Sequence, residues 1–405
     1  MKQKQQARET TGALPALPGF LQQAEPGILA ASQLQQAQAA GIISATRPLN
    51  ERQLQPASLD LRLGKRAWRL QASFLPGRGV SIADKLAQLA MHEMPLDDGA
   101  VLEKGCVYIA ELEEQVALPA GLSGHANPKS STGRLDIFTR LITDGATEFE
   151  YVAPGYGGPL YAEISPRTFS VLVRRGSCLS QLRLRLGEPV ISDAVMQQLQ
   201  QQVGLVHGGG LAGRDIRDGV PLSVDLSGQA RPGLPGLIGW RARKHAGLVD
   251  IDRPAAYPVA AFWEQVTTAD LTDGGLVLNP DEFYILASRE CVTVPADYAA
   301  EMTAYDTRVG EFRAHYAGFF DPGFGLSSPE AGIAGTGKTR AVLEVRSHDV
   351  PFLIEEDQVV CRLVYEPLSA PPSALYGSRG SGSHYQAQGL QLAKHFLPPE
   401  EGDHG

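Results

Sequence analysis

Apolar and polar residues alternate along most of the chain. In SLDLRLG (58–64) every second residue is a leucine, and comparable short runs follow to about residue 187. A period of two residues is typical of a β-strand with one buried face. Helical spacing is limited to GILAASQLQQAQAAGIIS (27–44) and DAVMQQLQQQVG (193–204). The pattern predicts an all-β protein with a few short helices.

The strand pattern occurs twice in the same order. GAVLEKGCVYIAELEEQVALPAG (99–121) aligns without a gap on GLVLNPDEFYILASRECVTVPAD (275–297), and residues 163–184 align on 344–365. Generic alternation in a β-protein is the alternative, but two long matching windows favour an internal repeat. We expect lobe one at 27–192 and lobe two at 220–370. A flexible tail (1–26), a linker (193–219) and a C-terminal arm (371–405) complete the chain.

Composition and charge narrow the class of protein. The 44 glycines and 28 prolines fit short strands joined by turns. The net charge of −9 argues against nucleic acid or an anionic membrane as partner. No apolar run is long enough to span a membrane, and the four cysteines are isolated, as expected of thiols in a reducing compartment. We expect a cytoplasmic protein.

A short cluster of bases and hydroxyls lies in lobe one. The stretch NPKSSTGR (127–134) contains Lys129, Ser130, Ser131 and Arg134. Cations, hydroxyls and backbone N–H groups are the groups that bind phosphate. The cluster therefore predicts a phosphate site.

Two other phosphate or metal motifs carry less weight. GIAGTGKT (332–339) matches the phosphate-loop pattern, but that pattern acts only between a strand and a helix. Here FGLSSPEA before it has the composition of a loop, and RAVLEVRS after it alternates like a strand. Zinc-dependent deamination needs H-x-E and P-C-x-x-C, and the sequence contains neither. We expect no protein-held transition metal.

Glu163 and Glu344 occupy the same repeat position inside apolar strands. A carboxylate that faces outward at an edge is one interpretation of each. A buried carboxylate is costly without a partner or a task, and burial raises its pKa towards the range useful for proton transfer.

Two Pro-Gly turns with aromatic neighbours also occupy equivalent positions in the two lobes, YVAPGYGG (151–158) and GFFDPGFG (318–325). Only the second contains an acid, Asp321, whose carboxylate is suited to bind a sugar hydroxyl.

These motifs together resemble the deoxycytidine triphosphate deaminase and dUTPase superfamily. SLDLRLG resembles its N-terminal strand, and PKSSTGR resembles its Arg-Ser-Ser-x-x-Arg phosphate motif with Lys129 in place of the first arginine. FDPGF and AVLEV resemble its sugar-binding turn and its catalytic-glutamate strand. YGSRGSGSHYQAQG resembles the deaminase C-terminal arm, with His384 in place of a lysine. The resemblance covers most of residues 27–395.

The resemblance implies two dUTPase-like jelly-roll β-barrel lobes that deaminate dCTP to dUTP and ammonia without zinc. It implies that Glu344 is the general acid/base and that Ser130 and Arg134 position the attacking water. It also implies Mg²⁺ with the triphosphate, and a homo-oligomer. The residues that it implies for substrate binding are Lys129, Ser131, Asp321, Val342, Leu343, Tyr376, His384 and Gln388.

Each lobe departs from the family pattern in a complementary way. Lobe two lacks the phosphate motif, because Tyr305, Asp306, Thr307 and Gly310 occupy its positions, and lobe one lacks the sugar acid and the arm. We therefore expect one composite site per pair of lobes, with Glu163 of lobe one as the equivalent, in the other lobe, of the catalytic Glu344. A dUTPase-like diphosphohydrolase, a bifunctional enzyme and a non-catalytic nucleotide-binding regulator stay open as alternatives. So do CTP or a modified cytosine as substrate, and a site within or between chains.

Overall fold

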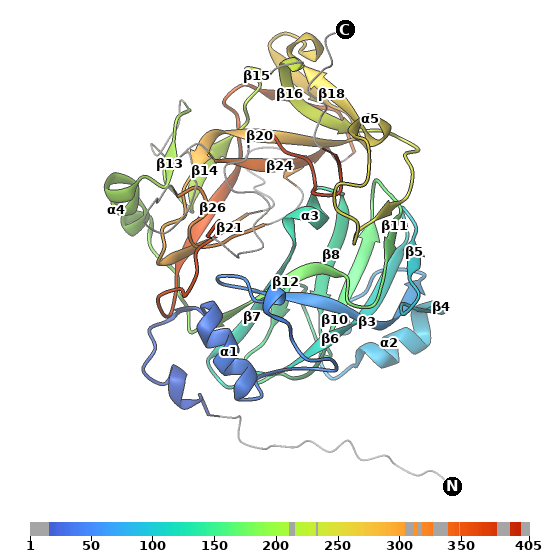
Figure 1. Ribbon diagram of the computed structural model, residues 1–405, viewed down its shortest axis with the longest axis vertical. Coiled ribbons are helices and arrows are strands. Elements are labelled where there is room, and N and C mark those ends of the chain that lie inside the picture. Colours follow the sequence, from blue (N-terminus) through green and yellow to red (C-terminus); the bar gives the residue numbers. More distant parts are fainter. Residues whose placement is uncertain are drawn as a thin grey trace.

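The computed structural model describes residues 16–209, 215–231, 234–303, 312–314, 318–326, 339–347, 349–378 and 389–397. These residues form a mostly β-stranded molecule, as the alternating pattern predicts (Figure 1). Its α-helices are short: α1 (Ala31–Ala39), α2 (Ile82–Leu89), α3 (Ser130–Gly133), α4 (Asp193–Val203) and α5 (Val259–Phe262). Single 3-10 turns occur at Gly19–Leu21, Glu51–Gln53 and Thr268–Asp270.

Lobe one is built on a ten-stranded sheet. Its strands are β1 (Gly27–Ile28), β2 (Ile43–Ala45), β3 (Leu59–Leu70), β4 (Ala90–Pro95), β6 (Val107–Ala117), β7 (Leu122–Pro128), β8 (Ile137–Ile142), β9 (Tyr151–Val152), β10 (Gly157–Pro166) and β12 (Cys178–Leu186). The main order is β8-β10-β6-β3-β12-β7-β9, with β1 on β12, β2 on β6 and β4 on β3.

Lobe two has a seven-stranded sheet in the order β15-β16-β20-β24-β22, with β13 on β20 and β18 on β16. A second sheet runs β14-β26-β21-β23, and β19 pairs with β25. The bounds are β13 (Val206–His207), β14 (Val220–Ser223), β15 (Gln229–Arg231), β16 (Leu234–Ala242), β18 (Trp263–Thr267), β19 (Gly275–Leu278), β20 (Phe283–Val292), β21 (Tyr298–Met302), β22 (Phe312–Ala314), β23 (Phe319–Phe320), β24 (Arg340–Ser347), β25 (Phe352–Glu355) and β26 (Val359–Pro367).

Equivalent strands of the two lobes pair in the same register. In lobe one Glu163 of β10 lies opposite Ile109 of β6, and in lobe two Glu344 of β24 lies opposite Ile285 of β20. These pairs are related by the offsets of 181 and 176 residues at which the sequence windows align. Because side chains alternate between the faces of a sheet, the shared register places both glutamates on corresponding faces.

The two lobes pack against each other as one body. Strand β17 (Val249–Asp250) of lobe two pairs in parallel with β11 (Val171–Val173) of lobe one, which also pairs with β5 (Ala100–Leu102). One hydrophobic core extends across both lobes, with Phe169 of lobe one against Phe262 and Trp263 of lobe two. The relative position of the lobes is therefore set by apolar burial as well as by strand pairing.

The described part of the N-terminal segment is not a free tail. Residues 16–26 were expected to belong to it, but Leu21 is only 1% exposed and packs in the core of lobe one. A single apolar residue beside a turn has no periodicity, so the sequence pattern does not reveal this anchor. None of the helices in the described ranges has the length and apolar character needed to cross a membrane.

Candidate active site

A cavity of about 1070 Å³ lies between the lobes and is lined by both of them. Helix α3, which carries the phosphate cluster, is situated at this junction, close to β24 (Figure 1). The sequence-predicted residues that line the cavity are Lys129, Ser130, Ser131, Arg134, Asp321, Val342, Glu344 and Tyr376. The phosphate cluster of lobe one and the glutamate of lobe two thus face one space within a single chain.

Three predicted residues are not brought to this cavity by the described structure. The Leu343 side chain is fully buried in the core of lobe two, because alternation along β24 turns Val342 and Glu344 to the cavity and Leu343 away from it. Its side chain therefore cannot bind substrate, which corrects that expectation and leaves it only a backbone role. His384 and Gln388 lie outside the described residues.

Glu344 is an acid of the cavity whose pKa is strongly raised. Its side chain is nearly buried, and this loss of hydration raises its pKa to about 8. The nearby Arg134 guanidinium opposes that rise, and the Asp136 carboxylate adds to it. At neutral pH the carboxyl is therefore mostly protonated, with a minor ionised fraction. A group poised in this way can both donate and accept a proton.

Gly133 of helix α3 lies close to the Glu344 carboxyl. A methyl group added at Gly133 would lie 2.4 Å from Oε2 of Glu344. Arg134 follows at the end of the helix, is 3% exposed, and donates from Nη1 to the Gln391 carbonyl (3.0 Å). The sequence STGR therefore places hydroxyls, a close-fitting glycine and a buried cation around one glutamate.

Asp321 is held by an arginine from the other lobe. Arg183 of β12 is 1% exposed, and its Nη2 lies 3.2 Å from Oδ1 of Asp321. The same guanidinium donates to the carbonyls of Ala300 and Phe320 and lies over the Phe319 ring, 3.9 Å from its centroid. Burial raises the pKa of Asp321, and Arg183 counteracts this. The sequence-predicted sugar acid is thus a buried group with a fixed orientation.

Several cavity residues were not predicted from the sequence. Asp60 and Arg62 are the polar positions of SLDLRLG, and alternation alone places them in solvent, yet they are only 5% and 6% exposed and line the cavity. Asp60 forms an ion pair with Lys129. Lys394 and His395, from the C-terminal segment, line the cavity as well. The sequence contained one sign of this role: Asp60 and Arg62, two successive residues on the polar face of one strand, are both charged.

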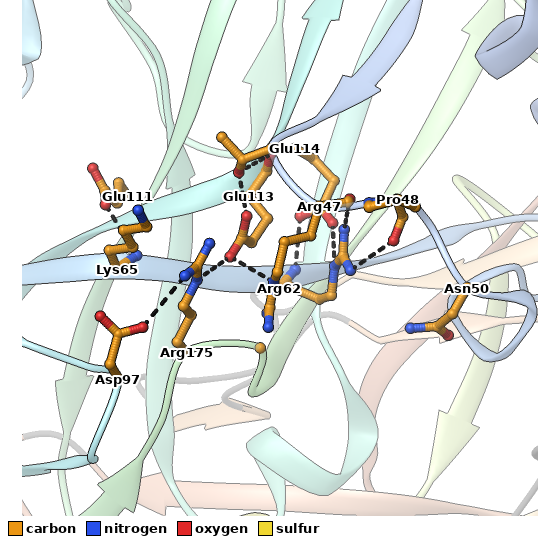
Figure 2. Close-up of polar contacts among 12 residues, drawn as sticks. Arg47, Pro48, Asn50, Arg62, Lys65, Asp97, Glu111, Glu113, Glu114 and Arg175 are labelled. Carbon is orange, nitrogen blue, oxygen red and sulfur yellow. Dashed lines mark hydrogen bonds and ion pairs between the residues drawn. The ribbon is translucent and has the colours of Figure 1, made fainter.

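A buried charge network holds the rim of the cavity (Figure 2). Nε of Arg62 lies 2.8 Å from Oε1 of Glu114, and Arg62 also donates to the carbonyls of Arg47 and Pro48. Gln53 joins the network by donating to Oε1 of Glu114 (2.9 Å). Residues 50–56, which line the cavity, are thereby fixed to the core of lobe one.

A second pair of charges reinforces the same region. Glu113 lies beside Glu114 on β6 and accepts from Nε of Arg175 (2.6 Å) and pairs with Nε of Arg47 (3.0 Å), as Figure 2 shows. These two arginines hold the pKa of the Glu113 carboxyl below its usual range against the opposing effect of burial. Arg47, which comes just before the rim residues 50–56, is therefore held both by its side chain on Glu113 and by its carbonyl on Arg62.

Glu163, the repeat equivalent of Glu344, has a different environment. Its carboxylate accepts from Nε of Arg140 on the neighbouring strand β8 (3.1 Å) and from Ser73 Oγ (2.6 Å). It does not line the cavity between the lobes. A buried acid with an arginine partner is a structural ion pair, so its burial needs no chemical task.

Two further expectations from the sequence concern a protein-held metal and the phosphate-loop motif GIAGTGKT. Among the described residues, no group of three or more His, Cys, Asp or Glu side chains is placed to hold a metal ion. Residues 331–338, which include most of GIAGTGKT, lie outside the described ranges. Strand β24 begins at Arg340, directly after the motif. The helix that a phosphate loop requires on that side is therefore replaced by a strand.

Comparisons with known proteins match one family along most of the chain. The model of the 2'-deoxycytidine 5'-triphosphate deaminase N-terminal domain matches residues 25–188, and that of the C-terminal domain matches residues 192–396. The crystal structure of 2'-deoxycytidine 5'-triphosphate deaminase from Agrobacterium tumefaciens is 50% identical, with a TM-score of 0.78, and the match covers 86% of this chain and 99% of that one.

Two curated relatives match a shorter part. A dCTP deaminase of Haloarcula marismortui is 32% identical over 133 residues, which are 32% of this chain and 65% of the relative. A protein of Beutenbergia cavernae named dCTP deaminase, dUMP-forming, is 32% identical over 119 residues, 29% of this chain and 55% of the relative. The chain therefore spans less than two thirds of the length of these two relatives.

Proposed function

The chain belongs to the 2'-deoxycytidine 5'-triphosphate deaminase family, and we propose that it hydrolyses dCTP to dUTP and ammonia. The observation that carries the proposal is the meeting of Glu344 with Ser130 and Arg134 in one cavity. A phosphate-binding regulator would need the cluster of lobe one, but it would have no use for a buried carboxyl whose pKa is raised to about 8. The arrangement therefore favours an enzyme over a binding module.

The proposed reaction is an addition followed by an elimination at C4 of cytosine. Ionised Glu344 takes a proton from water, the oxygen adds to C4, and Glu344 returns the proton to N3 or to the departing amine. Ser130 and Arg134 hold the water and offset the charge of the tetrahedral intermediate. C4 gains the oxygen and loses the nitrogen, so one water is consumed for each ammonia released.

The remaining cavity groups match the rest of the nucleotide. Asp321, with its orientation set by Arg183, accepts from a deoxyribose hydroxyl. Lys129, Ser131 and the α3 turn face the phosphates, and Tyr376, which packs on Phe324 (5.6 Å between centroids), closes one side. We propose the same phosphate role for His384 and Gln388 on the basis of the family resemblance.

Mg²⁺ is proposed to enter with the triphosphate. Magnesium is usually held by one or two carboxylates together with substrate phosphates. Asp60 and Asp252 line the cavity and supply such oxygens, so they would hold the ion. Its chemistry there is the neutralisation of phosphate charge. We propose that no zinc takes part, and excess Mg²⁺ with a zinc-selective chelator should leave the rate unchanged.

The decisive experiment separates two products. The protein is incubated with dCTP and Mg²⁺, and ammonia and pyrophosphate are measured independently. We expect ammonia and dUTP without pyrophosphate. No ammonia from an intact, nucleotide-binding protein would refute the deaminase proposal. CTP and 5-methyl-dCTP in parallel reactions define the substrate.

A second candidate is a bifunctional enzyme that goes on to release dUMP and pyrophosphate. The observation that favours it is the dUMP-forming name of relatives such as that of Beutenbergia cavernae. Equal amounts of ammonia and pyrophosphate from dCTP would establish it. Pyrophosphate from dUTP without ammonia from dCTP would instead indicate a diphosphohydrolase.

A further inference from the structure

The segment 389–397 belongs to the C-terminal arm (371–405) and is fixed to both lobes. The Lys394 carbonyl accepts from the Ala255 N–H (2.9 Å), and the His395 carbonyl accepts from the Ala256 N–H (2.9 Å). Phe396 packs in the aromatic cluster with Phe262 and Trp263. The backbone at Lys394 is therefore anchored on lobe two, whereas Arg134 of lobe one binds the same segment at the Gln391 carbonyl.

The anchored backbone places the Lys394 side chain at the cavity. Lys394 lines it together with Lys129, Asp60 and Asp252. Burial lowers the pKa of Lys394, and the charge of Lys129 lowers it further. Two ammonium groups thus act on each other in a partly dehydrated space that they share with the carboxylate of Asp60. A triphosphate that enters this space would bring its negative charge within reach of both ammonium groups.

We propose that Lys394 is a phosphate-binding residue that contacts the triphosphate opposite Lys129, so that the cations of the phosphate subsite come from the first lobe and from the end of the chain. This inference rests on the proposed function, because it takes a nucleoside triphosphate as the ligand of the cavity. A lysine binds phosphate as a point charge with three donors, and one charged hydrogen bond contributes about 1.5–3 kcal/mol. Its loss should therefore weaken binding on the order of 10-fold or more.

The test compares Lys394→Met, which keeps the aliphatic stem and removes the charge, with Lys394→Arg, which keeps the charge. In the methionine variant we expect the KM for dCTP to rise on the order of 10-fold while kcat stays within about twofold. The arginine variant should stay within about threefold of the unchanged protein. Lys104→Met is the matched control, because Lys104 is exposed and does not line the cavity.

A second readout does not depend on deamination. Binding of inorganic tripolyphosphate is measured by calorimetry for each variant, and the Kd should rise on the order of 10-fold in Lys394→Met only. Unchanged tripolyphosphate binding in a folded Lys394→Met protein would overturn the inference. If the unchanged protein binds tripolyphosphate but releases no ammonia from dCTP, the deaminase proposal fails. The phosphate role of Lys394 is then still tested by comparing the tripolyphosphate Kd of Lys394→Met with that of the unchanged protein.

Discussion

At the scale of single residues, two glutamates at the same repeat position have different environments. Glu163 is paired with Arg140 and Ser73, whereas Glu344 lies in the cavity against Gly133. The main determinant is the neighbouring strand: β8 supplies an arginine opposite Glu163. Burial raises the pKa of Glu344 to about 8, and the Arg134 charge offsets only part of that rise. Chemical function at this position is therefore decided by the surroundings of the residue.

The first prediction compares these two acids. Glu344→Gln should lower kcat on the order of 10²-fold or more, because an amide cannot transfer a proton. Glu163→Gln should keep kcat within about threefold but lower the melting temperature, because it weakens a buried pair. Ammonia release and thermal unfolding are measured for both. Equal loss of kcat in the two variants would contradict a single site per chain.

The second prediction follows from the raised pKa of Glu344. Between the unfolded value of 4.5 and about 8, the folded protein binds a proton that the unfolded chain has lost, so stability falls as pH rises. Glu344→Gln removes this proton linkage. We subtract the free energy of unfolding of the unchanged protein from that of the variant at each pH. This difference should be larger at pH 8 than at pH 5 by at least about 1 kcal/mol. Urea unfolding at both pH values measures the difference, and a constant gap would argue against the raised pKa.

At the scale of elements, β3 and α3 illustrate how polar positions acquire a role. The polar face of β3 looks into the cavity, where Asp60 pairs with Lys129, and Arg62 binds Glu114 beneath the rim. Helix α3 is only one turn long, and its Gly133 contacts Glu344. The position of this short helix is set by β7 and β8, the strands of the ten-stranded sheet that come before and after it.

The third prediction tests the fit of α3. Gly133→Ala leaves the helical backbone unstrained but brings a methyl group to within 2.4 Å of the Glu344 carboxyl. That group must move, so we expect kcat to fall on the order of 10-fold or more. Gly157→Ala is the control, because nothing lies within 4 Å of its added methyl group. Activity loss in the control alone, or in neither variant, would contradict the close contact.

At the scale of the whole molecule, residues from two unequal lobes of a single chain line one cavity. Arg183 of lobe one binds Asp321 in the turn of lobe two, and Arg134 of lobe one binds the C-terminal segment. Arg346 of β24 forms an ion pair with Asp136 across the same junction. The family resemblance implies a homo-oligomer, so we still expect copies of the chain to associate.

The fourth prediction uses this arrangement. Arg134→Ala and Glu344→Gln should each be nearly inactive, since Arg134 offsets charge near Glu344. Because both residues line the cavity of one chain, mixing the two variants should restore no activity. Differently tagged chains verify that subunits have exchanged. Recovery of about a quarter of the normal rate after exchange would show that sites form between chains.

The sequence by itself determined the strand content, the equivalent positions of the two glutamates and the phosphate cluster, because these depend on local periodicity and on short motifs. The alternating pattern of 58–64 also located β3, but it did not reveal that Asp60 and Arg62 are buried. Only the tertiary structure decided that this polar face lines a cavity, that Glu163 has an arginine partner, and that Lys394 reaches the site. The physical reason is that burial and electrostatic environment arise from segments far apart in the chain, and no local pattern records which segments meet.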